Sequence, residues 1–341
     1  MTRARPGVDG PAGAPGGARR RVLFVFLDGV GLGPGDPGIN PLARARLPTL
    51  AALLDGRAPV LEEAPHHGRA ASLVALDATL GVPGLPQSGT GQAALLTGRN
   101  AAALFGRHFG PWTPTALRPL VERESVLARA AAAGRAVAFA NAYPEELMDA
   151  LAAAAEGARL PLPARIAAPL AARAAGLLTR GTAALARGDA VASEITNDAW
   201  RERLGRLEVP VITAAGAGRN LARIATAHDL TLFAHYATDT AGHRGGMAGA
   251  LAALERVDAF LAGILEALPG GALLVVASDH GNLEDTRTGH TRNPALCLVA
   301  GPDHQRLAAR LGSLTDVAPA LLEWLGVEGP GAPADWRGIR G

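Results

Sequence analysis

The 341-residue sequence contains no lysine, because all 33 of its basic side chains are arginine. Schiff-base chemistry and the P-loop both need lysine, so both are excluded. Cys297 is the only cysteine, which excludes an intramolecular disulfide and a thiolate metal cluster. Aromatic residues make up only 4% of the chain and the arginines are interspersed, so we expect no nucleic-acid partner.

Long hydrophobic runs are also missing. No apolar stretch approaches the ~20 residues that span a bilayer, and residues 1–20 lack the apolar segment of a secretory signal. We therefore expect a cytoplasmic protein with no membrane partner.

The 33 basic and 31 acidic residues give a net charge of +2, and hydrophobic residues make up 48%, enough for a large buried core. Nothing in the sequence indicates the oligomeric state.

Short apolar runs alternate with helical segments along most of the chain. The run Val22–Leu27 has no polar alternation and stops at Asp28, which is typical of a strand buried on both faces. Strands of this kind are expected at 22–27, 72–76, 136–140, 231–237, 272–278 and 295–300, and helices at 121–133, 219–227 and 247–268. The alternation predicts an α/β fold with a mostly parallel central sheet flanked by helices.

Two segments depart from this alternation. Residues 1–20 are rich in glycine and proline and are expected to form a flexible arm. Residues 144–210 are alanine-rich, contain several prolines and lack a strand pattern, so we interpret them as a small helical insertion that forms a lid. The alternative is that these helices only cover a sheet face. Residues 21–143 and 211–341 then form the metal-binding core.

Aspartate and histidine side chains gather just past the expected strand ends, where open α/β sheets carry their reactive groups. The six residues are Asp28, Asp239, His243, Asp279, His280 and His290. Three carboxylates and three imidazoles form a ligand set suited to Mn²⁺ or Zn²⁺. Because they exceed what one ion needs, the sequence predicts two divalent metal ions.

A candidate nucleophile lies in the glycine-rich segment Gln87–Gln92, ahead of an apolar helix. Small residues around Ser88 let the backbone approach a ligand, and a helix N-terminus favours phosphate. Thr90 competes with Ser88 as the reactive hydroxyl. The alternative is a glycine-rich turn that only caps the helix.

The chain resembles the alkaline phosphatase superfamily, in particular its cofactor-independent phosphoglycerate mutase and phosphopentomutase branch. The resemblance lies in segments 27–31, 87–92, 239–243, 278–282, 289–294 and 315–322. It implies one ion held by Asp239, His243 and His290, and a second held by Asp28, Asp279, His280 and the Ser88 oxygen. It also implies that Ser88 is the catalytic nucleophile and forms a phosphoserine intermediate.

The resemblance further implies a small phosphorylated metabolite as substrate, with Thr90, Gln92 and Asn141 as candidate substrate contacts. Gln92 stands where the mutases have a histidine, and residues 144–210 contain no equivalent of their substrate-binding arginine–aspartate pair. These differences and the short lid favour a phosphatase over a phosphomutase. Sulfate ester hydrolysis is disfavoured by the residues after Ser88. A catalytically idle module that binds metal or a phosphorylated ligand is the alternative of another class.

Overall fold

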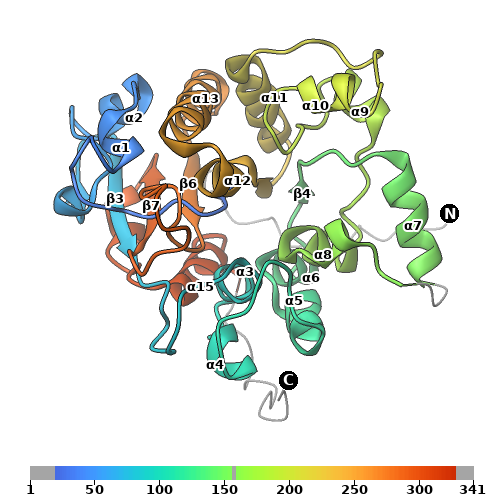
Figure 1. Cartoon of the computed structure of the whole chain (residues 1–341). Helices are drawn as coiled ribbons and strands as arrows, with labels where there is room; N and C mark the ends of the chain where they lie inside the picture. Colours follow the sequence, from blue (N-terminus) through green and yellow to red (C-terminus); the bar gives the residue numbers. More distant parts are fainter. Residues whose placement is uncertain (1–19, 156–158, 328–341) are drawn as a thin grey trace, which may run out of the picture.

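The structure is a computed structural model that describes residues 20–155 and 159–327. All but the last residue of the expected arm therefore lies outside the described residues. The described chain forms a seven-stranded sheet in the order β2-β3-β7-β6-β1-β5-β4 (Figure 1). The strands are β1 (Arg21–Leu27), β2 (His66–His67), β3 (Ala71–Leu76), β4 (Val137–Phe139), β5 (Leu230–His235), β6 (Ala272–Ser278) and β7 (Ala295–Ala300).

The expected α/β fold is confirmed, and its sheet is mixed, with three parallel and three antiparallel strand pairs. β4, β5, β1 and β6 run parallel to one another. β7 is antiparallel to β6 and β3, and the short β2 is antiparallel to β3. The sequence did not predict β2, because its two histidines form no apolar run.

Helices cover both faces of the sheet, giving a three-layer arrangement (Figure 1). One face carries α1 (Pro41–Arg44), α2 (Pro48–Leu53), α11 (Ala214–Thr226) and α13 (Gly246–Ala267). The other carries α3 (Ser88–Thr97), α4 (Ala101–Phe105), α5 (Arg118–Glu124), α6 (Val126–Ala132), α8 (Ala167–Ala174), α14 (His304–Ala308) and α15 (Leu314–Trp324). The remaining helices are α7 (Glu145–Ala155), α9 (Thr182–Ala186), α10 (Asp198–Glu202), α12 (Ala237–Arg244) and the short 3₁₀ turns η1 (Leu61–Glu63), η2 (Thr115–Leu117) and η3 (Leu162–Arg165).

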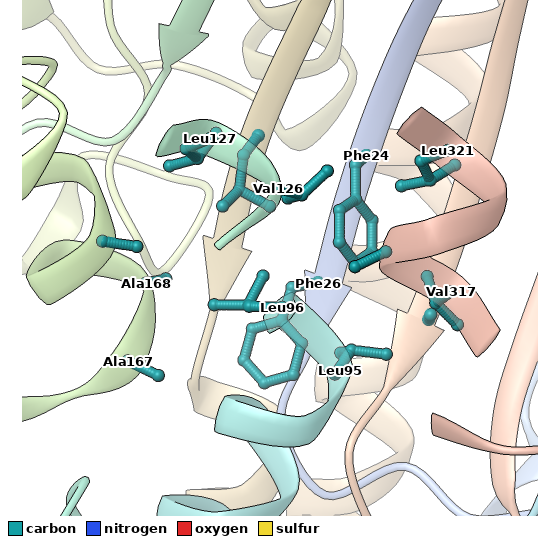
Figure 2. Close-up of a cluster of buried hydrophobic side chains, with 14 of the residues drawn as sticks. Phe24, Phe26, Leu95, Leu96, Val126, Leu127, Ala167, Ala168, Val317 and Leu321 are labelled. Carbon is teal, nitrogen blue, oxygen red and sulfur yellow. The ribbon is translucent and has the colours of Figure 1, made fainter. Parts of the chain in front are cut away.

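Strand β1 lies between β6 and β5 inside the sheet, and its side chains enter both of the large apolar clusters that the sheet separates. Phe24 and Phe26 point to one face, where they meet side chains of α3, α6, α8 and α15 (Figure 2). Leu23, Val25 and Leu27 point to the opposite face, beneath α11 and α13. Successive side chains of a strand alternate between faces, so a strand that is apolar throughout must be covered on both.

Three expected element boundaries are wrong, and one of them is the start of α11, which lies at Ala214 and not at residue 219. The single helix expected at 121–133 is divided into α5 and α6 at Ser125, whose backbone is extended. The Ser125 hydroxyl accepts a hydrogen bond from the Ala128 N–H and so caps α6. Strand β5 ends at His235 and does not reach Ala237, because α12 begins at Ala237.

The alanine-rich segment 144–210 contains α7, η3, α8, α9 and α10. Residues 167–172 of α8 are buried against the core helices α3, α5 and α6. The division into core and lid remains a prediction, and α8 itself is packed as part of the core. Among the helices of residues 20–155 and 159–327, none combines the length and the hydropathy that a membrane span requires.

Helices α11 and α13 pack in backbone contact through glycines. A Cβ atom on Gly263 would lie 1.9 Å from the Ala215 carbonyl oxygen. We therefore expect Gly263→Ala to force the helices apart and to lower the free energy of unfolding by about 2–3 kcal/mol, as measured by urea denaturation. Gly249→Ala on the same helix is the control, because nothing lies within 4 Å of its Cβ position, and it should be neutral or slightly stabilising. Equal stability of the two variants would contradict this packing.

His235 is predicted to make folding sensitive to acid. Burial lowers the pKa of His235 from 6.5 to about 4, its Nδ1–H donates to the Ser193 carbonyl at 2.6 Å, and its Nε2 has no partner. Because the folded pKa lies below the unfolded value, stability is present above about pH 6.5 and is lost as the pH falls towards 4. The loss from this residue between pH 8 and pH 5 is about 2 kcal/mol. In urea denaturation at both pH values, His235→Asn should lose less stability on acidification than the wild type. The same loss in both proteins would contradict the prediction.

Candidate metal centre

The register of the central strands brings the predicted ligands to one edge of the sheet. Leu27 of β1 lies beside His235 of β5 and Ser278 of β6, so these three parallel strands end level with one another. Asp28 and Asp279 are the next residues after β1 and β6. The antiparallel β7 begins at the same edge, which brings in the loop that carries His290. Helix α12 supplies Asp239 and His243, and α3 begins at Ser88.

The first group of side chains consists of Asp239, His243 and His290. Asp239 and His243 are one helical turn apart on α12, and their Oδ1 and Nε2 atoms are 3.5 Å apart. The His290 Nε2 lies 3.1 Å from the His243 Nε2 and 3.7 Å from the Asp239 Oδ1. His290 donates its Nδ1–H to the Pro86 carbonyl at 2.8 Å, which leaves its Nε2 lone pair directed at the group. These three atoms form a small triangle of the kind that a metal ion occupies.

The second group lies next to it and consists of Asp28, Asp279, His280 and Ser88. The His280 Nε2 is 3.4 Å from the Asp28 Oδ1 and 3.7 Å from the Asp279 Oδ2. The Ser88 hydroxyl lies 2.9 Å from the same His280 nitrogen and 3.5 Å from the Asp28 Oδ1. The stacked rings of His280 and His290, 4.1 Å apart, join the two groups.

Burial without enough positive charge perturbs the pKa values of this cluster. Burial, reinforced by the neighbouring Asp28, raises the pKa of Asp279 well above its usual value. Burial likewise raises the pKa of Asp28. Burial alone would lower the pKa of His280, but the surrounding carboxylates outweigh it and raise that pKa to about 10. The pKa of His290 falls to about 4, because the ring is largely buried and close to His280. A cluster that retains protons in this way is short of cationic charge.

The residues present therefore fit divalent metal ions. The Asp279 Oδ2 is buried and has no hydrogen-bond partner, although a buried carboxylate oxygen ordinarily requires one. Two sets of ligand atoms, Asp239/His280/His290 and Asp28/Asp279/His280, each lie close enough together to share an ion. Nitrogen and oxygen donors of this kind suit Zn²⁺ and Mn²⁺.

The three predicted substrate contacts lie in different surroundings. Gln92 joins the cluster, because its side-chain amide donates to the Asp28 Oδ2 at 3.1 Å. The Thr90 hydroxyl instead accepts the Phe109 N–H at 3.1 Å. The Asn141 amide bonds both backbone groups of Ala234, at 2.7 and 2.8 Å. The Ser88 hydroxyl thus lies in the cluster, whereas the Thr90 hydroxyl and the Asn141 side-chain amide bond backbone groups. A substrate role for these three residues stays a prediction.

Two buried residues of the site were not predicted as functional. Asn282 donates its side-chain amide to the Asp239 Oδ1 at 2.6 Å and so orients that carboxylate. Glu284 is fully buried among the loops that carry the ligands. The one sequence feature that could have pointed to Glu284 is its position, five residues after Asp279 in the loop that follows β6. A glutamate in a loop ordinarily faces water, so its burial could not be predicted.

Comparison with known proteins gives matches of two kinds. Residues 212–329 match the family model of the Metalloenzyme superfamily, and this segment contains Asp239, His243, Asp279, His280 and His290. The 2,3-bisphosphoglycerate-independent phosphoglycerate mutase of Syntrophotalea carbinolica is 36% identical over 136 residues, which are 37% of this chain and 26% of that protein. The corresponding mutase of Cereibacter sphaeroides is 42% identical over 118 residues, 31% of this chain and 23% of that protein. The matches thus span about a quarter of the length of these mutases.

The fold has a relative among solved structures. The PH0037 protein from Pyrococcus horikoshii superimposes with a TM-score of 0.54 over 92% of this chain and 99% of that one, at 13% sequence identity. The α/β sheet and the two candidate ligand groups are typical of a metalloenzyme, and the family match supports divalent metal ions as cofactors. The matched segment is similar to the Metalloenzyme superfamily and to phosphoglycerate mutases, which supports the resemblance of the motifs to the alkaline phosphatase superfamily near its phosphomutase branch.

Proposed function

We propose that this chain is a phosphoryl-transfer enzyme that uses two divalent metal ions and the Ser88 nucleophile on a small phosphorylated metabolite. The observation that carries the proposal is the position of the Ser88 hydroxyl, 2.9 Å from the His280 Nε2 and 3.5 Å from the Asp28 Oδ1. Ser88 is also the first residue of α3, whose positive dipole end favours a phosphate group.

The proposed ions would be held by two sets of residues: Asp239, His243 and His290 for one, and Asp28, Asp279, His280 and the Ser88 oxygen for the other. Bound there, they would lower the pKa of the Ser88 hydroxyl and offset charge on the phosphoryl oxygens. Gln92 keeps Asp28 in place through its 3.1 Å hydrogen bond. Asn282 does the same for Asp239.

In the proposed reaction the Ser88 oxygen attacks the phosphorus atom, and the bond from phosphorus to the leaving alcohol breaks. The serine proton is transferred in net terms to that alcohol, and a phosphoserine remains. Attack by water then yields inorganic phosphate and restores Ser88, which is the phosphatase outcome. Attack by a second hydroxyl of the same substrate yields an isomeric phosphate ester, which is the phosphomutase outcome. The names of the matched relatives favour this second outcome.

A panel of phosphorylated metabolites tests the proposal. The full-length protein, stripped of metal and then reconstituted with Mn²⁺ or Zn²⁺, is incubated with sugar phosphates, phosphoglycerates and an aryl phosphate. Release of inorganic phosphate identifies a phosphatase, and an isomeric ester without release identifies a mutase. The metal-stripped protein is the control and should be inactive. Metal binding without turnover on any ester would show an idle binding module and overturn the proposal.

A further inference from the structure

The carboxylate of Glu284 lies at the centre of the metal-site loops without belonging to either ligand group. Its side chain is fully buried. The Oε2 atom accepts the backbone N–H groups of Gly31 at 3.0 Å and Asn282 at 2.8 Å. The Oε1 atom accepts the Thr291 hydroxyl and the Asn293 side-chain amide, the latter at 3.1 Å. A carboxylate has about four lone-pair positions, so these donors fill it and leave nothing for a metal ion.

The four donors come from three different loops, and each loop carries predicted ligands. Gly31 follows β1 and Asp28. Asn282 follows β6 and the pair Asp279-His280. Thr291 and Asn293 directly follow His290. Glu284 therefore connects ligands of both groups that are far apart in the sequence.

Asn282 extends this connection to α12. Its backbone N–H donates to Glu284, while its side-chain amide donates to the Asp239 Oδ1 at 2.6 Å and to the Asp239 carbonyl at 3.0 Å. The position of Asp239 thus depends on Asn282, and that of Asn282 on Glu284. Every segment that supplies a ligand, apart from the start of α3, is reached from Glu284 in one or two hydrogen bonds.

The surrounding backbone is built to admit this side chain. A Cβ atom at Gly31 would lie 2.5 Å from the Glu284 Cδ, and one at Gly281 would lie 2.3 Å from its Oε1. Both distances are shorter than van der Waals contact, so the two loops close directly onto the carboxylate. This close packing fixes the carboxylate relative to the two loops, so a change in its hydrogen bonds is transmitted to the loop backbones.

We propose that Glu284 is a positioning residue that sets the geometry of both ligand groups through these hydrogen bonds. The inference rests on the proposed function only in requiring that the two groups bind metal. Residues that orient metal ligands in this way typically change affinity or activity by about 10–100-fold. Glu284→Gln keeps the size of the side chain but presents an N–H₂ group to two of the four donors. We therefore expect the variant to bind metal about 10–100-fold more weakly than the wild type.

The experiment measures metal affinity directly and needs no substrate. Full-length wild type and Glu284→Gln are stripped with a chelator and titrated with Zn²⁺ and with Mn²⁺ in competition with a chromogenic chelator. Asp258→Asn is the matched control, because Asp258 is also a buried carboxylate that accepts two backbone N–H groups, from Thr49 at 3.0 Å and Leu50 at 2.9 Å. It lies on α13 and contacts no predicted ligand, so its variant should lose stability and keep full metal affinity.

A compensating substitution separates positioning from simple destabilisation. In Glu284→Gln combined with Asn293→Asp, the new amide donates to the new carboxylate and reverses the original polarity. The Thr291 hydroxyl can rotate and accept the second amide hydrogen. We expect the double variant to recover most of the lost affinity. Thr291→Val, which removes one donor and leaves Glu284 intact, gives a milder test if Glu284→Gln does not fold, and should also bind metal more weakly.

The outcomes separate this inference from the proposed function. Wild-type protein that binds neither ion would overturn both. Wild-type protein that binds metal, with unchanged affinity in Glu284→Gln or, where that variant does not fold, in Thr291→Val, would overturn the role of Glu284 alone. An equal loss of affinity in Asp258→Asn would also overturn it. Weaker binding in Glu284→Gln with recovery in the double variant supports the inference even if no substrate has been identified.

Discussion

Replacement of Ser88 by alanine is expected to abolish phosphoryl transfer, with a fall in kcat on the order of 10⁴-fold or more. Ser88 is 4% exposed, and its hydroxyl is the one oxygen of the α3 N-terminus that contacts both Asp28 and His280. Without that oxygen no phosphoserine can form. The effect is measured as kcat on the best ester of the metabolite panel, together with peptide mapping of the covalent phosphate after rapid acid quenching.

Thr90→Val is the matched control for this experiment. Thr90 lies half a helical turn from Ser88, but its hydroxyl accepts the Phe109 N–H and contacts neither ligand group. Its loss leaves that half-buried N–H without this partner and should cost about 1 kcal/mol of stability, while kcat stays within about tenfold of the wild type. Retained activity in Ser88→Ala with loss in Thr90→Val would instead assign the nucleophile to Thr90.

The positions of the proposed metal ligands could be predicted because they follow from strand ends. β1 and β6 each stop at an aspartate, and parallel strands end at a common edge, so the sequence alone predicts that Asp28 and Asp279 lie close together. Asp239 and His243 are four residues apart on a helix, which brings their side chains onto one face. Strand ends and helical spacing can both be read from the local sequence, without knowing how the loops pack in the folded protein.

The hydrogen-bond partners of these residues could not be predicted in the same way. Gln92 carries no mark in the sequence that directs its amide to Asp28, 64 residues away. Asn141 follows a strand, as a substrate contact would, yet its amide bonds the neighbouring strand at Ala234. Glu284 accepts the N–H of Gly31, 253 residues distant. These contacts depend on how segments far apart in the sequence pack against one another, which no periodicity encodes.

Replacement of Asp279 by asparagine is expected to change stability in opposite directions with and without metal. Asp279 is fully buried, its Oδ2 has no hydrogen-bond partner, and Asp28 lies nearby. In chelator the variant removes a buried carboxyl group that His280, 3.7 Å away, offsets only in part, while the asparagine oxygen can keep the hydrogen bond from the Gly29 N–H. We therefore expect the chelated variant to be about 1–3 kcal/mol more stable than the chelated wild type.

With saturating Zn²⁺ or Mn²⁺ the order reverses, because ions that bind only the folded state stabilise it by mass action. An ion present at a thousand times its dissociation constant contributes about 4 kcal/mol, and the variant loses most of this from the second group. Urea denaturation in chelator and in metal measures both effects, and metal analysis should find two ions in the wild type and one in the variant. The control Asp258→Asn removes a buried carboxylate that caps α2 by accepting N–H groups, so it should be less stable than the wild type in both conditions. If Asp279→Asn behaves like this control, Asp279 holds the fold together and binds no ion.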